Sequence, residues 1–155
     1  EDKVSESGKV RRDPFFKPDW SPEMLLSANY LTHPVIRREL FNKVGCLNPE
    51  KDGTQDWDLM LKISEETDRI EHIPKVLYHW RQVPGSTAAF LDAKSYVFDR
   101  QLRCVKEHLE RRGIRDPKTE FESTGFLRAT WPASGKKVSI IIPTRDNVDY
   151  LKKCI

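Results

Sequence analysis

The sequence predicts an α/β fold in which short strands alternate with helices around a modest core. Residues 88–112 contain no Gly or Pro and repeat apolar side chains at helical spacing, which indicates one long helix. Residues 56–66 present a second apolar helix face. Residues 138–142 form a continuous apolar run, which is typical of a strand buried on both faces of a parallel sheet.

Local start and stop patterns place the remaining helices. Ser21, Pro22 and Glu23 offer a capping hydroxyl, a proline at the first helical position and a carboxylate near the positive helix end, so a short helix is expected over residues 22–27. Residues 37–44 are expected to form another helix, which Gly45 ends. A last helix is expected to begin near Val148.

The strands are predicted from apolar and β-branched content between turn residues. Residues 30–36 suit an edge strand, because Pro34 interrupts them. Residues 75–80 suit a second strand, and residues 120–131 suit two short strands around Gly125. Residues 1–20 are polar and are interpreted as an extended loop.

Composition narrows the classes of protein. The 155 residues carry a net charge of +3 with both signs interspersed, and the short basic run of Lys9, Arg11 and Arg12 is interpreted as a solvated loop. A nucleic-acid surface would show a larger basic cluster, so nucleic acid is not an expected partner. Three widely spaced cysteines indicate free thiols in a reducing compartment. No apolar run reaches the roughly 20 residues that span a bilayer.

Several side chains could carry chemistry, and each also has a structural interpretation. Asp56 and Asp58 lie at a loop-to-helix junction, where a carboxylate can cap the helix or act as a general base. Because they are two positions apart, they face different sides of the helix, and at most one is expected to face a given substrate. His79 lies between two aromatic residues on the expected strand and is either exposed or a ligand. Arg81 could bind phosphate through its forked donors.

Three motifs follow one another along the chain: FKPDWSPEMLLSANY at residues 16–30, DGTQDWDL at 52–59 and HIPKVLYHWR at 72–81, followed by GSTA at 85–88. In this order they resemble the family-2 glycosyltransferases of bacterial surface-polysaccharide synthesis. The resemblance covers most of residues 1–90. VSIIIPT at residues 138–144 also resembles the first nucleotide-binding strand of the same family.

The resemblance implies a truncated fold of the GT-A type, the nucleotide-sugar transferase fold, with a mixed sheet, a long C-terminal helix and an extra parallel-type strand. Residues 1–90 would be the metal and acceptor half of one domain, and residues 91–136 a long helix, a hairpin and a linker. Residues 137–155 would open a second domain of the same type, with Pro143, Thr144 and Asp146 at the end of its nucleotide strand. The nucleotide-binding half is expected to precede residue 1, so the chain alone is expected to be inactive.

The resemblance also implies roles for the candidate residues. Asp2 matches the last carboxylate of the family's DxD motif and His79 a histidine that completes metal coordination, so Mn²⁺ or Mg²⁺ is the expected cofactor. Asp56 matches the base that deprotonates the acceptor, although Gln55 replaces the usual preceding Glu. A flexible segment that closes over the donor diphosphate matches Arg81, Gly85, Ser86 and Thr87. The acceptor side is expected to include Trp20, Asn29, His33 and Trp57.

The expected reaction is an inverting transfer of a sugar from a nucleotide sugar to a glycan or lipid-linked acceptor. The resemblance implies a cytoplasmic location and leaves open a peripheral position at the inner face of the membrane. The alternative hypothesis is a non-catalytic glycosyltransferase-like interaction module, which the replacement of the usual Glu by Gln55 favours.

Overall fold

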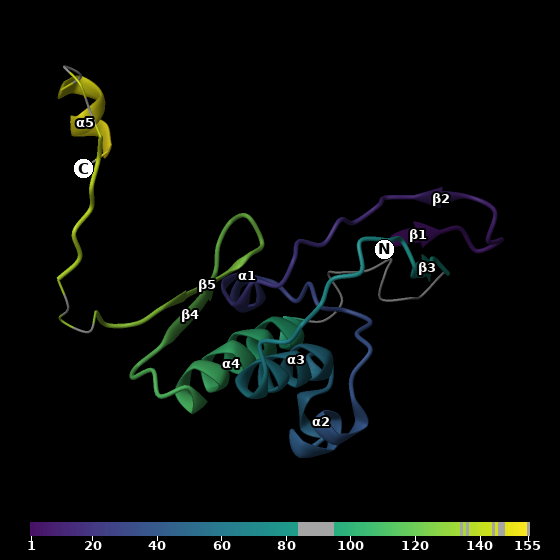
Figure 1. Ribbon diagram of the computed structural model, residues 1–155. Coiled ribbons are helices and arrows are strands. Elements are labelled where there is room, and N and C mark those ends of the chain that lie inside the picture. The colour runs from purple at the N-terminus through teal and green to yellow at the C-terminus, as the bar shows by residue number, and fades with distance from the viewer. Residues whose placement is uncertain (84–94, 134, 136, 144, 146–147, 155) are drawn as a thin grey trace.

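The computed structural model describes residues 1–83, 95–133, 135, 137–143, 145 and 148–154. It shows a mixed α/β arrangement with two small sheets, which confirms the predicted fold class at this level (Figure 1). The elements in chain order are β1 (Asp2–Val4), β2 (Arg11–Arg12), α1 (Pro22–Ser27), α2 (Arg38–Lys43), the 3-10 helix η1 (Pro49–Lys51), α3 (Gln55–Glu66), β3 (His79–Arg81), α4 (Ser95–Arg111), β4 (Lys118–Phe121), β5 (Leu127–Thr130) and α5 (Val148–Cys154).

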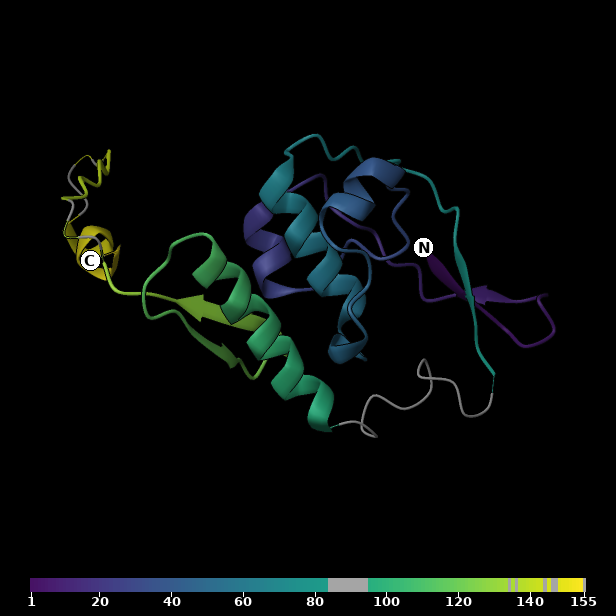
Figure 2. The same ribbon diagram turned by 90° about the horizontal axis from the view of Figure 1, so that it is seen from below.

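Helices α3 and α4 form the centre of the molecule. They lie side by side in both views, and the β4–β5 hairpin and α1 cover them on one side (Figures 1 and 2). Their facing side chains make one continuous core that also takes residues from α1, Tyr30 and β5. The core residues are Leu25, Tyr30, Trp57, Leu59, Met60, Leu61, Ile63, Cys104, Val105, Leu109 and Leu127.

A three-stranded mixed sheet lies at the other end of the molecule from the β4–β5 hairpin (Figure 2). Its strand order is β2-β1-β3, with β1 antiparallel to β2 and parallel to β3. The register pairs Lys3 with Arg12 and Asp2 with His79. A mixed sheet was predicted, and the structure confirms it.

The predicted helices are found close to their expected bounds. The Ser21 hydroxyl accepts a hydrogen bond from the backbone N–H of Met24 at 3.1 Å, which is the predicted cap of α1. Helix α4 begins at Ser95, and residues 88–94 of the predicted long helix lie outside the described residues. The predicted strand pair around Gly125 is the antiparallel β4–β5 hairpin.

The strand predictions were less accurate. Residues 1–20 contain β1 and β2 and are not only a loop, because these strands pair with each other and with the distant β3. The predicted edge strand over residues 30–36 is wrong: His33 has a φ of 59°, which breaks an extended chain, and Pro34 has no N–H to donate. The second predicted strand, residues 75–80, shifts to His79–Arg81.

The apolar run at residues 138–142 does not form a buried strand. Its side chains are exposed, with Ile141 at 91% of its maximal exposed area, and no described strand pairs with it. A run of this kind becomes a central strand only when it has neighbours on both sides. Helix α5, which follows, lies apart from the other elements in both views (Figures 1 and 2). No helix among the described residues is long and apolar enough to cross a membrane.

Candidate functional site

Asp2 and His79 face each other across two parallel strands. They are register partners, and Oδ1 of Asp2 lies 2.5 Å from Nδ1 of His79. The second carboxylate oxygen, Oδ2, accepts a hydrogen bond from Nε of Arg11 at 2.6 Å. Asp2 is only 7% exposed, so this carboxylate is buried between an imidazole and a guanidinium. The hydrogen bond from His79, helped by Arg11, holds the pKa of Asp2 below its ordinary value despite desolvation.

Arg11 is a site residue that the sequence interpretation missed. The basic run that contains it was assigned to a solvated loop, but β2 returns antiparallel to β1 and brings Arg11 to Asp2. The turn-forming segment Ser5-Glu6-Ser7-Gly8 between two short extended stretches was the pattern that could have predicted this hairpin.

Glu1 belongs to a second cluster next to Asp2. Its Oε2 lies 3.3 Å from Nζ of Lys17 and 2.9 Å from Nδ1 of His33, and it accepts a hydrogen bond from the Thr32 hydroxyl at 3.2 Å. Burial opposes ionisation of this carboxyl, but Lys17 and His33 outweigh it, so its pKa lies below the ordinary value. The His33 ring also stacks on Tyr78, the residue before His79, with ring centroids 3.5 Å apart. His33, which was predicted for the acceptor side, therefore braces the strand that carries His79.

Asp56 is an exposed carboxylate in the first turn of α3. Its Oδ2 accepts a hydrogen bond from the side-chain amide of Asn29 at 2.9 Å, and its Oδ1 accepts one from the backbone N–H of Trp57 at 3.0 Å. Asp58 faces the opposite way: it is 1% exposed and lies 2.6 Å from Nζ of Lys62. The two acids thus face different sides of the helix, as their spacing predicted, and Asp56 is the exposed one.

One short segment connects the two carboxylate groups. Asn29 contacts Asp56 at one end, and Thr32 and His33 contact Glu1 at the other. Four residues of extended chain span at most roughly 14 Å. The segment therefore limits the distance between the α3 N-terminus and the β1–β3 pair.

The other predicted site residues are distributed differently. Trp57 is 3% exposed, and its indole N–H donates to the carbonyl of Leu25 at 2.8 Å, so it serves the core and offers no open surface to an acceptor. Trp20 is partly buried against the same core. Arg81 donates from Nη1 to the carbonyl of Glu6 at 2.6 Å, which holds its guanidinium over the β1–β2 turn.

The structure does not describe several of the predicted positions. Gly85, Ser86 and Thr87 lie outside the described residues, as do Thr144 and Asp146. Pro143 is exposed in an irregular segment. The role of the closing loop and the second domain over residues 137–155 stay predictions.

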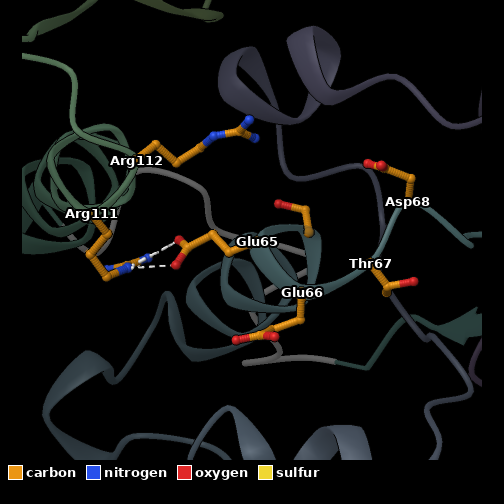
Figure 3. A pocket seen from close by; sticks show the side chains of 7 residues that line it. Glu65, Glu66, Thr67, Asp68, Arg111 and Arg112 are labelled. Atoms are coloured by element: carbon orange, nitrogen blue, oxygen red, sulfur yellow. Dashed lines mark hydrogen bonds and ion pairs between the residues drawn. The ribbon is translucent and has the colours of Figure 1, made fainter.

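A pocket of about 390 Å³ lies at the C-terminal ends of α3 and α4, away from the predicted site (Figure 3). Figure 3 shows the Arg111 guanidinium directed at the Glu65 carboxylate, which it contacts through Nε at 3.0 Å and Nη2 at 2.7 Å. Glu65 also lies 2.6 Å from Nδ1 of the buried His108. These contacts use the charged groups to join the two helices, which is a structural role.

Comparison with known proteins relates the chain to two curated sequences. It is 40% identical over 160 aligned residues to an uncharacterized protein, y4gI, of Sinorhizobium fredii, in an alignment that covers all of this chain and 18% of that protein. It is also 40% identical over 147 residues to the O-antigen biosynthesis protein RfbC of Myxococcus xanthus, which covers 94% of this chain and 12% of that protein. The chain thus spans less than a fifth of the length of these relatives. No protein-family model and no solved structure matches it.

Proposed function

We propose that this chain carries the metal-binding and acceptor-activating part of an inverting glycosyltransferase of family 2 that acts in surface-polysaccharide synthesis. The similarity to part of an O-antigen biosynthesis protein supports the polysaccharide role. The main support for this reaction is a connection between two carboxylates. The exposed Asp56 and the buried Asp2–His79 pair are connected through residues 29–33 and Glu1.

The side chains of Asp2 and His79 offer a carboxylate oxygen and an imidazole nitrogen, donors that suit Mn²⁺, and the carboxylate alone suits Mg²⁺. In this structure the two side chains share a hydrogen bond, so a cation would bind them only after that bond opens. Among the described residues, no third His, Cys, Asp or Glu joins them. Mg²⁺ is commonly held in this way, by one or two protein carboxylates together with substrate phosphates and water. A cation held by Asp2 and His79 would act as a Lewis acid that neutralises the charge of the departing diphosphate.

Asp56 performs the proton transfer in this proposal. The acceptor hydroxyl oxygen forms a bond to the anomeric carbon of the donor sugar, while the bond from that carbon to the diphosphate oxygen breaks on the opposite face. The hydroxyl proton moves to the Asp56 carboxylate, which Asn29 and the Trp57 N–H hold in place. General-base catalysis of this kind is typically worth about 10²–10⁴-fold in rate. Asp58 cannot replace Asp56, because it is buried and paired with Lys62.

The test is the substitution Asp56→Asn in the full-length protein. We expect sugar transfer to fall by at least about 10²-fold while binding of the nucleotide sugar is unchanged, because the lost carboxylate acts only on the acceptor. Asp52→Asn, an exposed acid of the preceding loop, is the matched control. Unchanged turnover in Asp56→Asn would refute the base assignment. Absence of any nucleotide-sugar turnover in the unmodified protein, across a panel of donors, would favour the non-catalytic interaction module.

A further inference from the structure

We propose that Arg11 is a substitute cation: it neutralises Asp2 in the absence of a metal ion, and it moves to the diphosphate of the donor once a metal ion occupies the site. This inference rests on the proposed function and adds to it a second binding residue for the nucleotide sugar.

The first observation is the way in which the Asp2 carboxylate is shared. Oδ1 of Asp2 is hydrogen-bonded to His79, and Oδ2 is hydrogen-bonded to Arg11. A cation can therefore bind either oxygen only after His79 or Arg11 moves. A buried carboxylate needs a partner of opposite charge, because burial disfavours an unpaired ion. Arg11 is 54% exposed, so its side chain can leave Asp2 without opening the core.

The second observation concerns Arg81, whose guanidinium was predicted from the sequence to bind the diphosphate. Arg81 is engaged with the Glu6 carbonyl, and its Nη1 would lie 3.2 Å from a Cβ placed on Gly8, so it is packed against the β1–β2 turn. Arg11 is the guanidinium that contacts Asp2, the carboxylate proposed to bind the metal ion. A diphosphate bound to a metal ion on Asp2 would lie beside Arg11, whose forked donors suit phosphate oxygens.

If Arg11 changes partners in this way, removing it should change the affinity for the metal ion and the affinity for the diphosphate in opposite directions. Without Arg11, a positive charge is removed from beside Asp2, and Oδ2 becomes free, so the metal ion alone binds more tightly, by about three- to tenfold. Without Arg11, a diphosphate on the metal-loaded protein loses a charged donor, so it binds more weakly, by about tenfold. A residue that only supports the fold would change both affinities in the same direction or neither.

Arg12 provides a matched control. It follows Arg11 in the two-residue strand β2 and carries the same charge, but it pairs with Lys3 whereas Arg11 pairs with Val4. Successive strand residues face opposite sides, so Arg11 shares the face of Asp2 and Val4, and Arg12 does not. Arg12→Ala therefore changes the net charge equally without touching Asp2.

The experiment measures Mn²⁺ binding by electron paramagnetic resonance and binding of inorganic pyrophosphate to the Mn²⁺-loaded protein by calorimetry. Arg11→Ala is expected to strengthen the first and weaken the second, Arg11→Lys to give smaller changes of the same signs, and Arg12→Ala to leave both near the unmodified values. Equal effects of Arg11→Ala and Arg12→Ala, changes of the same sign, or no change would overturn the inference.

Asp2→Asn separates this inference from the proposed function. If Asp2→Asn loses Mn²⁺ binding while Arg11→Ala behaves as the unmodified protein, the metal site stands and the role of Arg11 is wrong. If Asp2→Asn binds Mn²⁺ as tightly as the unmodified protein, or if no variant binds it, the metal site is wrong, and the inference falls with it.

Discussion

The side-chain amide of Asn29 donates a hydrogen bond to Oδ2 of Asp56 at 2.9 Å, although the two residues are 27 positions apart. Because the backbone N–H of Trp57 already binds Oδ1, this contact fixes the rotation of the carboxylate. Asn29 is thus a positioning residue for the proposed base.

We expect Asn29→Ala to reduce sugar transfer by roughly fivefold, because a hydrogen bond of this kind is worth about 1 kcal/mol net. The loss should fall on kcat more than on KM for the donor, since Asn29 orients the base and does not hold the nucleotide. Asn29→Asp should reduce transfer further, because it places a like charge beside Asp56. Steady-state kinetics that show equal rates for Asn29→Ala and the unmodified protein would contradict this role.

Tyr30 anchors the segment that carries Asn29. Its side chain is buried, and its hydroxyl accepts from the Ser21 N–H at 2.8 Å and donates to the Ser21 carbonyl at 3.1 Å. Tyr30→Phe leaves both backbone groups without this partner, which should lower the free energy of unfolding by about 1–3 kcal/mol in urea denaturation. Tyr78→Phe is the control: its ring is more exposed and keeps its stack on His33, so a change within about 0.5 kcal/mol is expected. Similar losses in both variants would argue against the anchor.

The helices could be predicted from the sequence because their determinants are local. The Ser21-Pro22 start, the apolar face of α3 and the long run of α4 each lie within one segment. The strands of the mixed sheet could not, since β1 has only three residues and finds its parallel partner more than 70 positions away. The run at residues 138–142 shows the converse: its strong local pattern forms no strand, and no described strand lies beside it.

The candidate site was predictable in part for the same reason. Asp2, Asp56 and His79 were singled out from motifs, but the pairing of Asp2 with His79 depends on the register of β1 and β3. The contact of Asp56 with Asn29, and that of Asp2 with Arg11, needs the folded chain. Trp57 matched the same motif as Asp56, yet one step along α3 turns its side chain into the core.

The Glu65–His108–Arg111 network should make stability sensitive to acid. Burial lowers the pKa of His108 from 6.5 despite the neighbouring Glu65 carboxylate, so the unfolded chain binds more protons than the folded one as pH falls through that value. The stabilisation is fully present above pH 6.5 and is lost as pH falls from there toward the lower folded pKa. Glu65, whose pKa lies below 4.5 because Arg111 and His108 outweigh its burial, adds a loss at lower pH.

Melting temperature measured between pH 7 and pH 5 checks this linkage. His108→Gln should flatten the pH dependence, since it removes the titrating group. Glu65→Gln should steepen it, because it removes the charge that raises the pKa of His108. A slope that is the same in all three proteins would show that other groups control the acid sensitivity.

Gly53, in the loop before α3, combines a left-handed backbone with a close neighbour. Its φ is 84°, and a Cβ at this position would lie 3.0 Å from Cγ2 of Val97 on α4. Gly45 has nearly the same φ, 87°, but nothing lies within 4 Å of its Cβ position.

Gly45→Ala therefore measures the backbone strain alone, about 1 kcal/mol, and Gly53→Ala adds a clash of about another 1 kcal/mol or more. In urea denaturation, Val97→Ala should cost less stability in the Gly53→Ala variant than it costs alone. In the Gly45→Ala variant it should cost the same as it costs alone. Equal losses for the two glycine variants, or no coupling to Val97, would contradict the close approach of this loop to α4.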